Sequence, residues 1–553
     1  MRTNLATEQE SPNQESRKAG KVALIQRIEW IVAIALSVLV LFLLLVRASH
    51  AGALWRDEAE SVQSARMPFG EMVRHIQFTS FPIVFPLCLR GYTTLFGSGD
   101  PSLRCFGLAV GILMLAAAWL ISAGLSRQPP LLFPAIVGLN ANFLIVGASL
   151  RGYGLGSALV LAAFGFTVMM LRSRTRRSSA LTFVVCLISM QSLFFNGPLI
   201  AAIVIAVGSV LLIRGEFKWM WRLIGIATVC GLSYAGYFLQ FYFQGSSWAK
   251  IQQAPFSFEL LWQKFVAAWG ETSTNIPTLW LVVVLASLLG AVWRLAAGVH
   301  VQSQRRDLVL FAVFLVPTAA IASFLFLKAL PRAPEERYLL ALTCLLVASA
   351  DLILVDLCSL YWIRIARLSL VIFAIATVPF VIWPKILQAE SNVEIVSKTI
   401  EENSNAGDLI VVSPWSYGVS FNWYYHGPTR WMTVPELPDH RTHRYDLLRE
   451  KMMSAAPLED VKREIATTLE SGKRVWFVGQ AEVPSAGNPP MRLTVAPDPA
   501  FGWQGAAYRT AWSREIGVFL QAHLQQVNAI VRPASSVSDR ENITLYRIEG
   551  WKH

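Results

Sequence analysis

The chain has few charged residues for its length, which excludes an ordinary soluble protein. Only 15% of its 553 residues are Asp, Glu, Lys or Arg, whereas 54% are hydrophobic, and the mean hydropathy is +0.46. A soluble protein of this size has about a quarter of its residues charged. Apolar runs of about 20 residues recur along the sequence and predict transmembrane helices.

The C-terminal part of the chain lacks cysteine altogether. All six cysteines, the last of which is Cys358, lie in or beside apolar segments, and none has a metal-binding spacing. Disulfide bonds and cysteine-ligated metals are therefore not expected. The sequence also has no internal repeat, which argues against a secondary transporter built from two related halves.

Basic residues do not gather on one face or arm, although the net charge is +12. They fall in short clusters between apolar runs, such as "RSRTRR" at 172–177 and "IRIAR" at 363–367. The retention of Lys and Arg in cytoplasmic loops explains this pattern better than binding to nucleic acid does. We therefore expect no nucleic-acid partner, a cytoplasmic N-terminus and a location in the plasma (inner) membrane.

Eleven apolar segments predict membrane spans, so the expected fold class is an α-helical polytopic membrane protein. The segments are 30–46, 105–125, 131–149, 154–171, 179–195, 198–213, 223–243, 277–293, 308–327, 338–357 and 366–383. Residues 1–27 are expected to be a disordered cytoplasmic tail. Residues 28–387 form the predicted membrane domain, in which the long loop 48–104 is external.

Residues 388–553 are much more polar and predict a small α/β domain outside the cytoplasm. "VEIVSKTIEENSNAGDLIVVS" at 393–413 predicts a helix, a turn and a buried strand. "RVWFVG" at 474–479 and "ITLYRIEG" at 543–550 also predict strands, with helical patterns at 443–453, 458–471 and 511–527.

The motif "LWRDEAE" places two adjacent carboxylates, Asp57 and Glu58, just beyond the first predicted span. Two interpretations stay open. Asp57 acts on a substrate at the external edge of the membrane, or it caps the helix predicted from residue 58, whose first turn favours acidic residues. One residue can serve both purposes. Arg104 is expected to pair with Asp100 and hold the outer end of the second span.

Three stretches in and after this loop resemble a known family. "WRDEAESVQSAR", "FPIVFPLCLRGYTTLFG" and "DPSLRCFGLAVGIL" are similar to the first external loop and second span of GT-C glycosyltransferases. The similarity is to the branch that contains protein O-mannosyltransferases and bacterial lipid A aminoarabinose transferases. "SLRGYGLG" at 149–156 and "ERYLL" at 336–340 resemble that family's later Arg-Tyr motifs, and the resemblance covers about residues 30–383.

The resemblance has two departures. The family's "HPPL" stands here as "SFPIVFP", without the histidine, and its later "HY" hairpin stands as "FFNGP" at 194–198. Both departures concern the acceptor side, so the identity of the acceptor is left open.

The resemblance implies transfer of a sugar from a polyprenyl-phosphate donor to a lipid, glycan or protein acceptor on the extracytoplasmic side. An acceptor hydroxyl needs a base, and Asp57 is the expected one, with a pKa held near or above its ordinary value by partial burial. Glu58 is expected to support it. The departing phosphate needs cations, for which Arg151 and Arg337 are the candidates, each in an Arg-Tyr context with Tyr153 and Tyr338.

Further charged residues have two interpretations each. Lys328 and Arg332, in the same late loop as Arg337, either bind substrate or anchor the chain in lipid head groups. Asp351 is expected to pair two helices. "DHRTHRYD" at 439–446, with His440 and His443, is typical of a solvated turn; the aromatic-rich "PWSYGVSFNWYYHGPTRW" at 414–431 suits sugar stacking, bilayer contact or a small core. No cofactor is expected, no motif indicates a metal site, and the participation of a divalent metal in the reaction is left open.

A second class of function is carried as an alternative. A polysaccharide ligase, flippase or transporter would also handle lipid-linked sugars with arginines, but without this transfer reaction. Detection of covalent transfer from a lipid-phosphate sugar separates the enzyme from a flippase or transporter.

Overall fold

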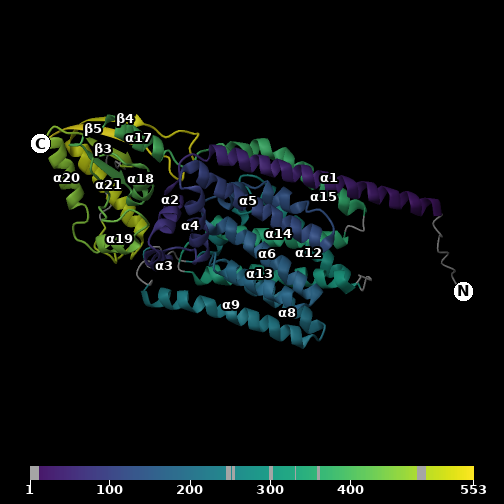
Figure 1. Ribbon diagram of the computed structural model, residues 1–553. Helices are drawn as coiled ribbons and strands as arrows, with labels where there is room; N and C mark the ends of the chain where they lie inside the picture. The colour runs from purple at the N-terminus through teal and green to yellow at the C-terminus, as the bar shows by residue number, and fades with distance from the viewer. Residues whose placement is uncertain are drawn as a thin grey trace.

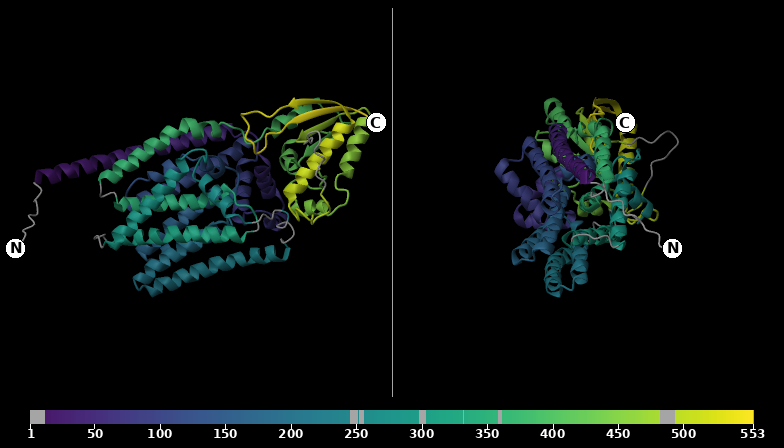
Figure 2. Two further views of the ribbon diagram at one scale, coloured as in Figure 1. Left: turned by 180° about the vertical axis from the view of Figure 1, so that it is seen from behind. Right: turned by 90° about the vertical axis from the view of Figure 1, so that its right-hand side faces the viewer.

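In the computed structural model, a bundle of helices and a smaller α/β domain lie end to end (Figure 1). The structure describes residues 12–244, 251, 256–297, 303–330, 332–357, 361–481 and 493–552. The N-terminal helix begins at the end of the bundle remote from the α/β domain, as the two further views in Figure 2 also show.

Within these described residues, eight helical segments are long and apolar enough to cross a membrane. They lie in α1 (Pro12–His50), α5 (Asp100–Ile121), α6 (Gly152–Ser173), α8 (Asn196–Ile213), α12 (Ile276–Ala296), α13 (Ser303–Ala329), η5 with α14 (Glu336–Leu339 and Leu340–Leu357), and α15 (Tyr361–Thr377) with its continuation through η6 (Val378–Ile382) and α16 (Trp383–Ile386). The chain is a multi-pass helical membrane protein, but the predicted total of eleven spans is not reproduced.

The predicted span 131–149 does not form a single helix. It contains two short helical turns, η3 (Phe133–Gly138) and η4 (Asn142–Gly147), separated at residues 139–141. The side chain of Asn140 accepts the Asn142 backbone N–H at 2.8 Å and donates to the Ala268 carbonyl at 3.2 Å. Such local side-chain bonds replace the helical ones, which explains the break.

Two other predicted spans also differ from long apolar helices. The segment 179–195 corresponds to α7 (Arg176–Met190), whose 15 residues are fewer than the roughly 20 that cross a hydrocarbon core. The segment 223–243 falls inside α9 (Phe217–Gln244), which is not among the eight.

Helix α1 begins earlier than the sequence predicts. Residues 12–27, expected to be a disordered tail, form its first turns, because good helix formers such as Lys, Arg, Gln and Glu extend the apolar helix backwards. Within this helix, buried Glu29 pairs with Arg364 and, at 3.1 Å, with Arg367.

Asp351 has the structural role that was expected. It lies 3.6 Å from Arg367 and accepts the backbone N–H groups of Leu132 and Phe133 at 3.0 and 2.8 Å. It therefore ties α14 to α15 and to the start of η3.

The loop between α1 and α5 is folded into α2 (Arg56–Arg66), α3 (Phe69–His75), η1 (Ile76–Phe78) and α4 (Val84–Phe96). Eight consecutive residues of α2, from Glu58 to Ala65, are buried. Burial of both faces of a polar helix follows from its position between the bundle and the α/β domain.

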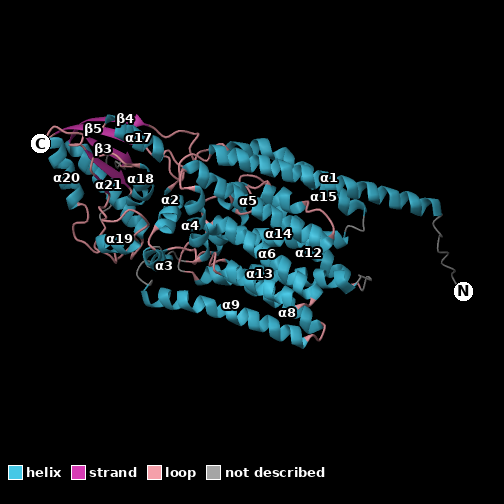
Figure 3. Cartoon of the chain, viewed as in Figure 1, coloured by secondary structure: helices cyan, strands magenta, loops and turns pink. Residues whose placement is uncertain are grey.

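The C-terminal domain has a five-stranded sheet in the order β2-β1-β3-β5-β4, seen in magenta in Figure 3. The strands are β1 (Leu409–Ser413), β2 (Trp431–Thr433), β3 (Val475–Gly479), β4 (Leu524–Val531) and β5 (Leu545–Trp551). β1 is parallel to β2 and β3, whereas β5 is antiparallel to β3 and β4. β1 and β3 are buried along their whole length, as central strands covered on both faces are.

The helices of this domain are α17 (Val393–Asn403), α18 (Gly418–Tyr424), α19 (Tyr445–Met452), α20 (Glu459–Glu470) and α21 (Gly505–His523), with η7 (Trp415–Tyr417) before α18. The helical pattern predicted at 511–527 ends at residue 523, and the chain then continues directly as β4. The strand was not predicted because its burial pattern is irregular at the edge of the sheet.

The domain is docked on the bundle through α18, which packs against α2. Gln63 donates to the Val419 carbonyl at 3.0 Å and accepts from Asn422 at 2.7 Å. The hydroxyl of Tyr424 accepts the Leu54 backbone N–H and donates to Asp100, both at 2.7 Å. These polar contacts fix the domain against the loop between α1 and α5.

Candidate functional site

A cavity of about 540 Å³ lies where the helix bundle meets the C-terminal domain. Its lining combines residues far apart in the sequence. They include Trp55, Arg56, Asp57, Glu60, Arg151, Tyr153, Arg332, Glu335, Arg337, Tyr338, Trp415, His443, Tyr445 and Arg509. The structure thus brings together six of the predicted site residues: Asp57, Arg151, Tyr153, Arg332, Arg337 and Tyr338.

Asp57 lies in the first turn of α2 and is held between two arginines. Its Oδ2 is 3.3 Å from Nη1 of Arg337, in η5, and 3.8 Å from Nη2 of Arg151, just before α6. The Asp57 backbone carbonyl accepts from Arg151 Nη1 at 2.7 Å. The N-cap of α2 is Trp55, with no side-chain capping bond, so the interpretation of Asp57 as the helix cap is wrong.

The electrostatic surroundings of Asp57 differ from those expected. Burial acts to raise its pKa, but Arg151, Arg337 and His443 together outweigh burial and hold the pKa below its ordinary value. The sequence-based expectation, a pKa near or above the ordinary value, took account of burial but not of these neighbouring cations. In this state the carboxylate is ionised and able to accept a proton, although it is a weak base.

The two arginines, which both line the cavity, each have a donor without a partner in the described part of the chain. Nε of Arg151 and Nε of Arg337 are both buried without a hydrogen-bond partner among the described residues. The indole Nε1 of Trp55 is in the same condition. Buried donors in native proteins are almost always paired, so these three groups are available to water or to a ligand in the cavity.

Glu60 is a site residue that sequence reasoning missed. Its Oε1 lies 3.1 Å from Nδ1 of His443 and accepts the His443 backbone N–H at 3.1 Å, while Oε2 is 3.4 Å from Arg151. His75 Nε2 is 3.7 Å away. Although burial alone raises the pKa of Glu60, His443 and these other donors hold it well below its ordinary value. The available signal was the spacing to Asp57, since residues three apart share one helix face.

His443 corrects the expectation of a solvated turn at 439–446. The residue is buried, its ring stands edge-on to Trp415 at 5.8 Å and stacks with Tyr445 at 5.9 Å. Its Nε2 is 4.0 Å from Asp57 Oδ1. The C-terminal domain therefore contributes directly to the cavity that contains Asp57.

Glu58 faces away from this cavity. Both of its carboxylate oxygens lie 3.0 Å from Arg104 Nη1, and Oε1 accepts the Leu150 backbone N–H at 3.1 Å. Successive residues on a helix point about 100° apart, and here Asp57 lines the cavity whereas Glu58 turns to Arg104. Arg104 therefore pairs with Glu58, whereas the expected partner, Asp100, accepts from Tyr424.

The remaining predicted residues divide into two groups. The Arg337 guanidinium lies 6.0 Å from the Tyr153 ring and 5.8 Å from the Tyr338 ring, and Arg332 is 5.8 Å from Tyr338. These contacts keep the cations over aromatic faces. Lys328, near the end of α13, is exposed and is not part of the cavity lining.

In the part of the chain that the structure describes, no group of three or more His, Cys, Asp or Glu residues is arranged to hold a metal ion.

Comparison with known proteins gave matches among solved structures alone: no family model and no curated protein matches the chain. The chain is similar to ArnT from Cupriavidus metallidurans bound to undecaprenyl phosphate, with 12% identity, 86% of this chain and 97% of that chain covered, and a TM-score of 0.37. It is also similar to the oligosaccharyltransferase AglB from Archaeoglobus fulgidus in complex with an inhibitory peptide and a dolichol-phosphate, with 12% identity, 80% and 69% covered, and a TM-score of 0.44.

A third structure is the Archaeoglobus fulgidus oligosaccharyltransferase tethered to an acceptor peptide, with 12% identity, 81% and 69% covered, and a TM-score of 0.42. ArnT and AglB are both membrane glycosyltransferases of the GT-C superfamily, the class that the sequence motifs resemble. Because each TM-score is below 0.5, no residue role is carried over from these structures.

Proposed function

We propose that the chain is a membrane glycosyltransferase that moves a sugar from a polyprenyl-phosphate donor to an acceptor hydroxyl, with Asp57 as general base. The observation that carries this proposal is the position of the Asp57 carboxylate between Arg151 and Arg337 on one cavity. A base beside two phosphate-binding groups is the arrangement that glycosyl transfer from a phosphate requires.

The charge of the cavity supports an anionic donor. Its lining carries five arginines and three carboxylates, a surplus of cations even with His443 neutral. The arginines are Arg56, Arg151, Arg332, Arg337 and Arg509, and the carboxylates are Asp57, Glu60 and Glu335. The Nε groups of Arg151 and Arg337, which have no partner among the described residues, are further donors that phosphate oxygens could use.

The reaction uses the same residues in sequence. As the bond between the sugar's anomeric carbon and the phosphate oxygen breaks, the phosphate takes the electron pair and its growing charge is stabilised by the arginines. The acceptor oxygen forms the new bond to the anomeric carbon, and its proton passes to Asp57.

Donor binding would also strengthen the base. A bound phosphate competes with Asp57 for Arg151 and Arg337, which are the two largest influences that lower the pKa of Asp57. When their charge is shared with phosphate, the pKa of Asp57 rises toward its ordinary value. The donor thereby turns a resting ion pair into a more effective base.

The proposed orientation places this cavity outside the cytoplasm of the plasma (inner) membrane. The stretch 214–222, which joins α8 to α9 and carries Arg214, Lys218 and Arg222 against Glu216, lies at the end of the bundle opposite the C-terminal domain (Figure 1). Basic connections favour the cytoplasmic side. A reporter fused after Trp383 is then active only outside the cytoplasm, and activity inside the cytoplasm contradicts this orientation.

The decisive experiment follows the sugar–phosphate bond. Purified protein in liposomes is given a radiolabelled polyprenyl-phosphate sugar and an envelope extract, and mass spectrometry identifies the acceptor that gains the sugar. We expect release of free polyprenyl phosphate with the wild type and not with Asp57→Asn. Movement of intact donor across the bilayer without cleavage would favour the flippase alternative.

A further inference from the structure

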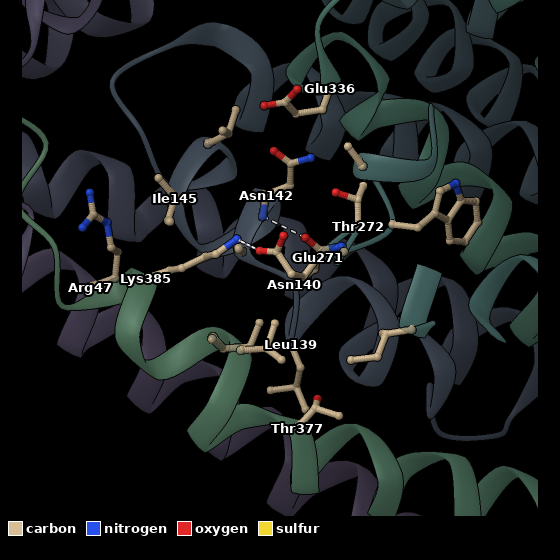
Figure 4. Close-up of a pocket in the computed structure, with 18 of the residues that line it drawn as sticks. Arg47, Leu139, Asn140, Asn142, Ile145, Glu271, Thr272, Glu336, Thr377 and Lys385 are labelled. Atoms are coloured by element: carbon tan, nitrogen blue, oxygen red, sulfur yellow. Dashed lines mark hydrogen bonds and ion pairs between the residues drawn. The ribbon is translucent and has the colours of Figure 1, made fainter. Parts of the chain in front are cut away.

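A second cavity, of about 490 Å³, lies beside the first and is not used by the proposed reaction. Segment η5 separates the two: Arg337 lines the first cavity, whereas Glu336 lines the second. Figure 4 shows the second cavity with Lys385 reaching Glu271 and with Asn140 and Asn142 side by side. Its walls come from the end of α1, η3–η4, residues 267–272 before α12, α12 itself, the α15–α16 region with residues 388–390, and residues 538–540.

The cations on this cavity are all paired with carboxylates of its lining, and the carboxylate of Glu336 is paired with a lysine outside it. Arg47 and Arg540 both pair with Glu390, Lys385 pairs with Glu271, and Glu336 pairs with Lys264 at 3.0 Å. Asp539, the remaining charged residue, is exposed at the rim. In contrast to the first cavity, the second offers no surplus of cations, so it does not select a phosphate.

The uncharged polar groups of the lining define which kind of head group this cavity would bind. The indole Nε1 of Trp269, a residue only 1% exposed, is buried without a hydrogen-bond partner among the described residues. Within the same described part, the side chains of half-buried Asn142 and exposed Thr272 make no hydrogen bond to protein, so solvent or a ligand can meet them. A buried unpaired N–H and free amide and hydroxyl groups match neutral hydroxyl groups, which both donate and accept.

The other part of the lining is apolar and comes from α12, from α15 with its continuation, and from the short turns at 133–147. It includes Leu139, Ile145, Ile276, Trp280, Ala374, Val381 and Ile382. Trp280 and Ile382 are 3% and 4% exposed, so this part of the cavity wall is apolar and shielded from solvent. A ligand here meets apolar surface at one end and hydrogen-bonding groups at the other.

We propose that this cavity is a second binding site, for a membrane amphiphile whose head group is uncharged and carries hydroxyl groups, as in a neutral glycolipid. The paired charges exclude a preference for an anionic head group. The free donors and acceptors recognise the hydroxyl groups, and the apolar wall receives the first part of the hydrocarbon chain. The site is independent of the proposed reaction, because none of its lining residues contacts Asp57.

The test measures binding of radiolabelled dodecyl maltoside, below its critical micelle concentration, to the full-length protein in lipid nanodiscs, with empty nanodiscs as the blank. Unlabelled dodecyl maltoside should displace the label, whereas dodecyl phosphate and dodecylphosphocholine should be weak competitors. Trp269→Phe keeps the ring but removes the N–H and should weaken binding about 2- to 10-fold, the range for one neutral hydrogen bond. Ala267→Trp, which fills the cavity, should weaken it at least as much.

Trp55→Phe is the matched control, since it removes the same kind of unpaired indole N–H from the neighbouring cavity. Binding of the maltoside should be unchanged in this variant. The proposal is overturned if dodecyl phosphate competes as well as the maltoside, or if both Trp269→Phe and Ala267→Trp bind like the wild type. These results concern binding alone, so they are separate from failure of sugar transfer.

Discussion

Oε1 of Glu60, on helix α2 in the loop between α1 and α5, lies 3.1 Å from Nδ1 of His443 in the C-terminal domain. Glu60 also lies 3.4 Å from Arg151, which in turn is 3.8 Å from Asp57. A buried chain of opposite charges thus links the domain to the residue proposed as the base. The position of the domain and the geometry at Asp57 are therefore coupled.

Replacing His443 with Asn should weaken both domain docking and sugar transfer. The variant leaves the buried Glu60 carboxylate with fewer partners, and a hydrogen bond to a charged group contributes about 1.5–3 kcal/mol. We expect a lower midpoint of thermal unfolding and a lower rate of transfer. His440→Asn is the control, because burial lowers the pKa of His440 to about 4 and the residue carries no charge at neutral pH. Equal effects of the two variants would contradict the role assigned to His443.

Replacing Asp57 with Asn should abolish most of the transfer without unfolding the protein. The amide has nearly the same shape but cannot take the acceptor proton, and loss of a positioned base costs about 10²–10⁴-fold in rate. Donor binding should persist, since Arg151 and Arg337 remain. The rate is measured with labelled donor, and the membrane abundance and unfolding midpoint are measured beside it. Full activity of this variant would rule out Asp57 as the base.

Replacing Glu58 with Gln should act on stability rather than on chemistry. The change leaves Arg104 facing an uncharged group in a buried site, and breaking a buried ion pair costs about 3–5 kcal/mol. We expect low membrane abundance, with activity per folded molecule close to the wild-type value. A stable Gln variant with a much lower rate per molecule would instead place Glu58 in the reaction.

Replacing Arg337 with Lys should weaken use of the donor. Lysine keeps the charge but loses the planar fork, including the Nε donor that has no partner in the free protein. The expected result is a higher KM for the polyprenyl-phosphate donor, measured in liposomes at several donor concentrations. If Lys and Ala variants are both as active as the wild type, Arg337 is an anchor in the membrane interface.

Burial of Glu541 should make the stability of the folded chain depend on pH between about 4.5 and 7. Burial raises its pKa from 4.5 to about 7, so between these values the folded chain keeps a proton that the unfolded chain loses. Stability therefore falls as pH rises from about 4.5 to 7. Glu541→Gln has no proton to lose and should remove this fall, because its amide can still meet Ser420 and the Arg56 backbone N–H. Unfolding midpoints at pH 5 and pH 7.5 test it; an unchanged pH dependence in the variant contradicts it.

Local composition was sufficient to predict much of this protein. Long apolar runs have no stable place except a membrane or a large core, which is why eight of the eleven predicted spans were found as long apolar helices. The strands at β1, β3 and β5 followed from short apolar runs between turns. The Arg-Tyr motifs also indicated residues that do meet at one cavity, because Arg151 and Arg337 both stand at helix ends on the same side of the bundle.

Only the tertiary structure decided which residues face one another. The sequence shows that Asp57, Glu58 and Glu60 are close together along the chain. It does not show that the helix bundle packs on one side of α2 and the C-terminal domain on the other. Rotation along the helix sends Glu58 to Arg104, while Asp57 and Glu60 meet Arg151 and His443. The lowered pKa of Asp57 has the same origin, since Coulomb interactions depend on distances between charges that lie up to 386 positions apart in the chain.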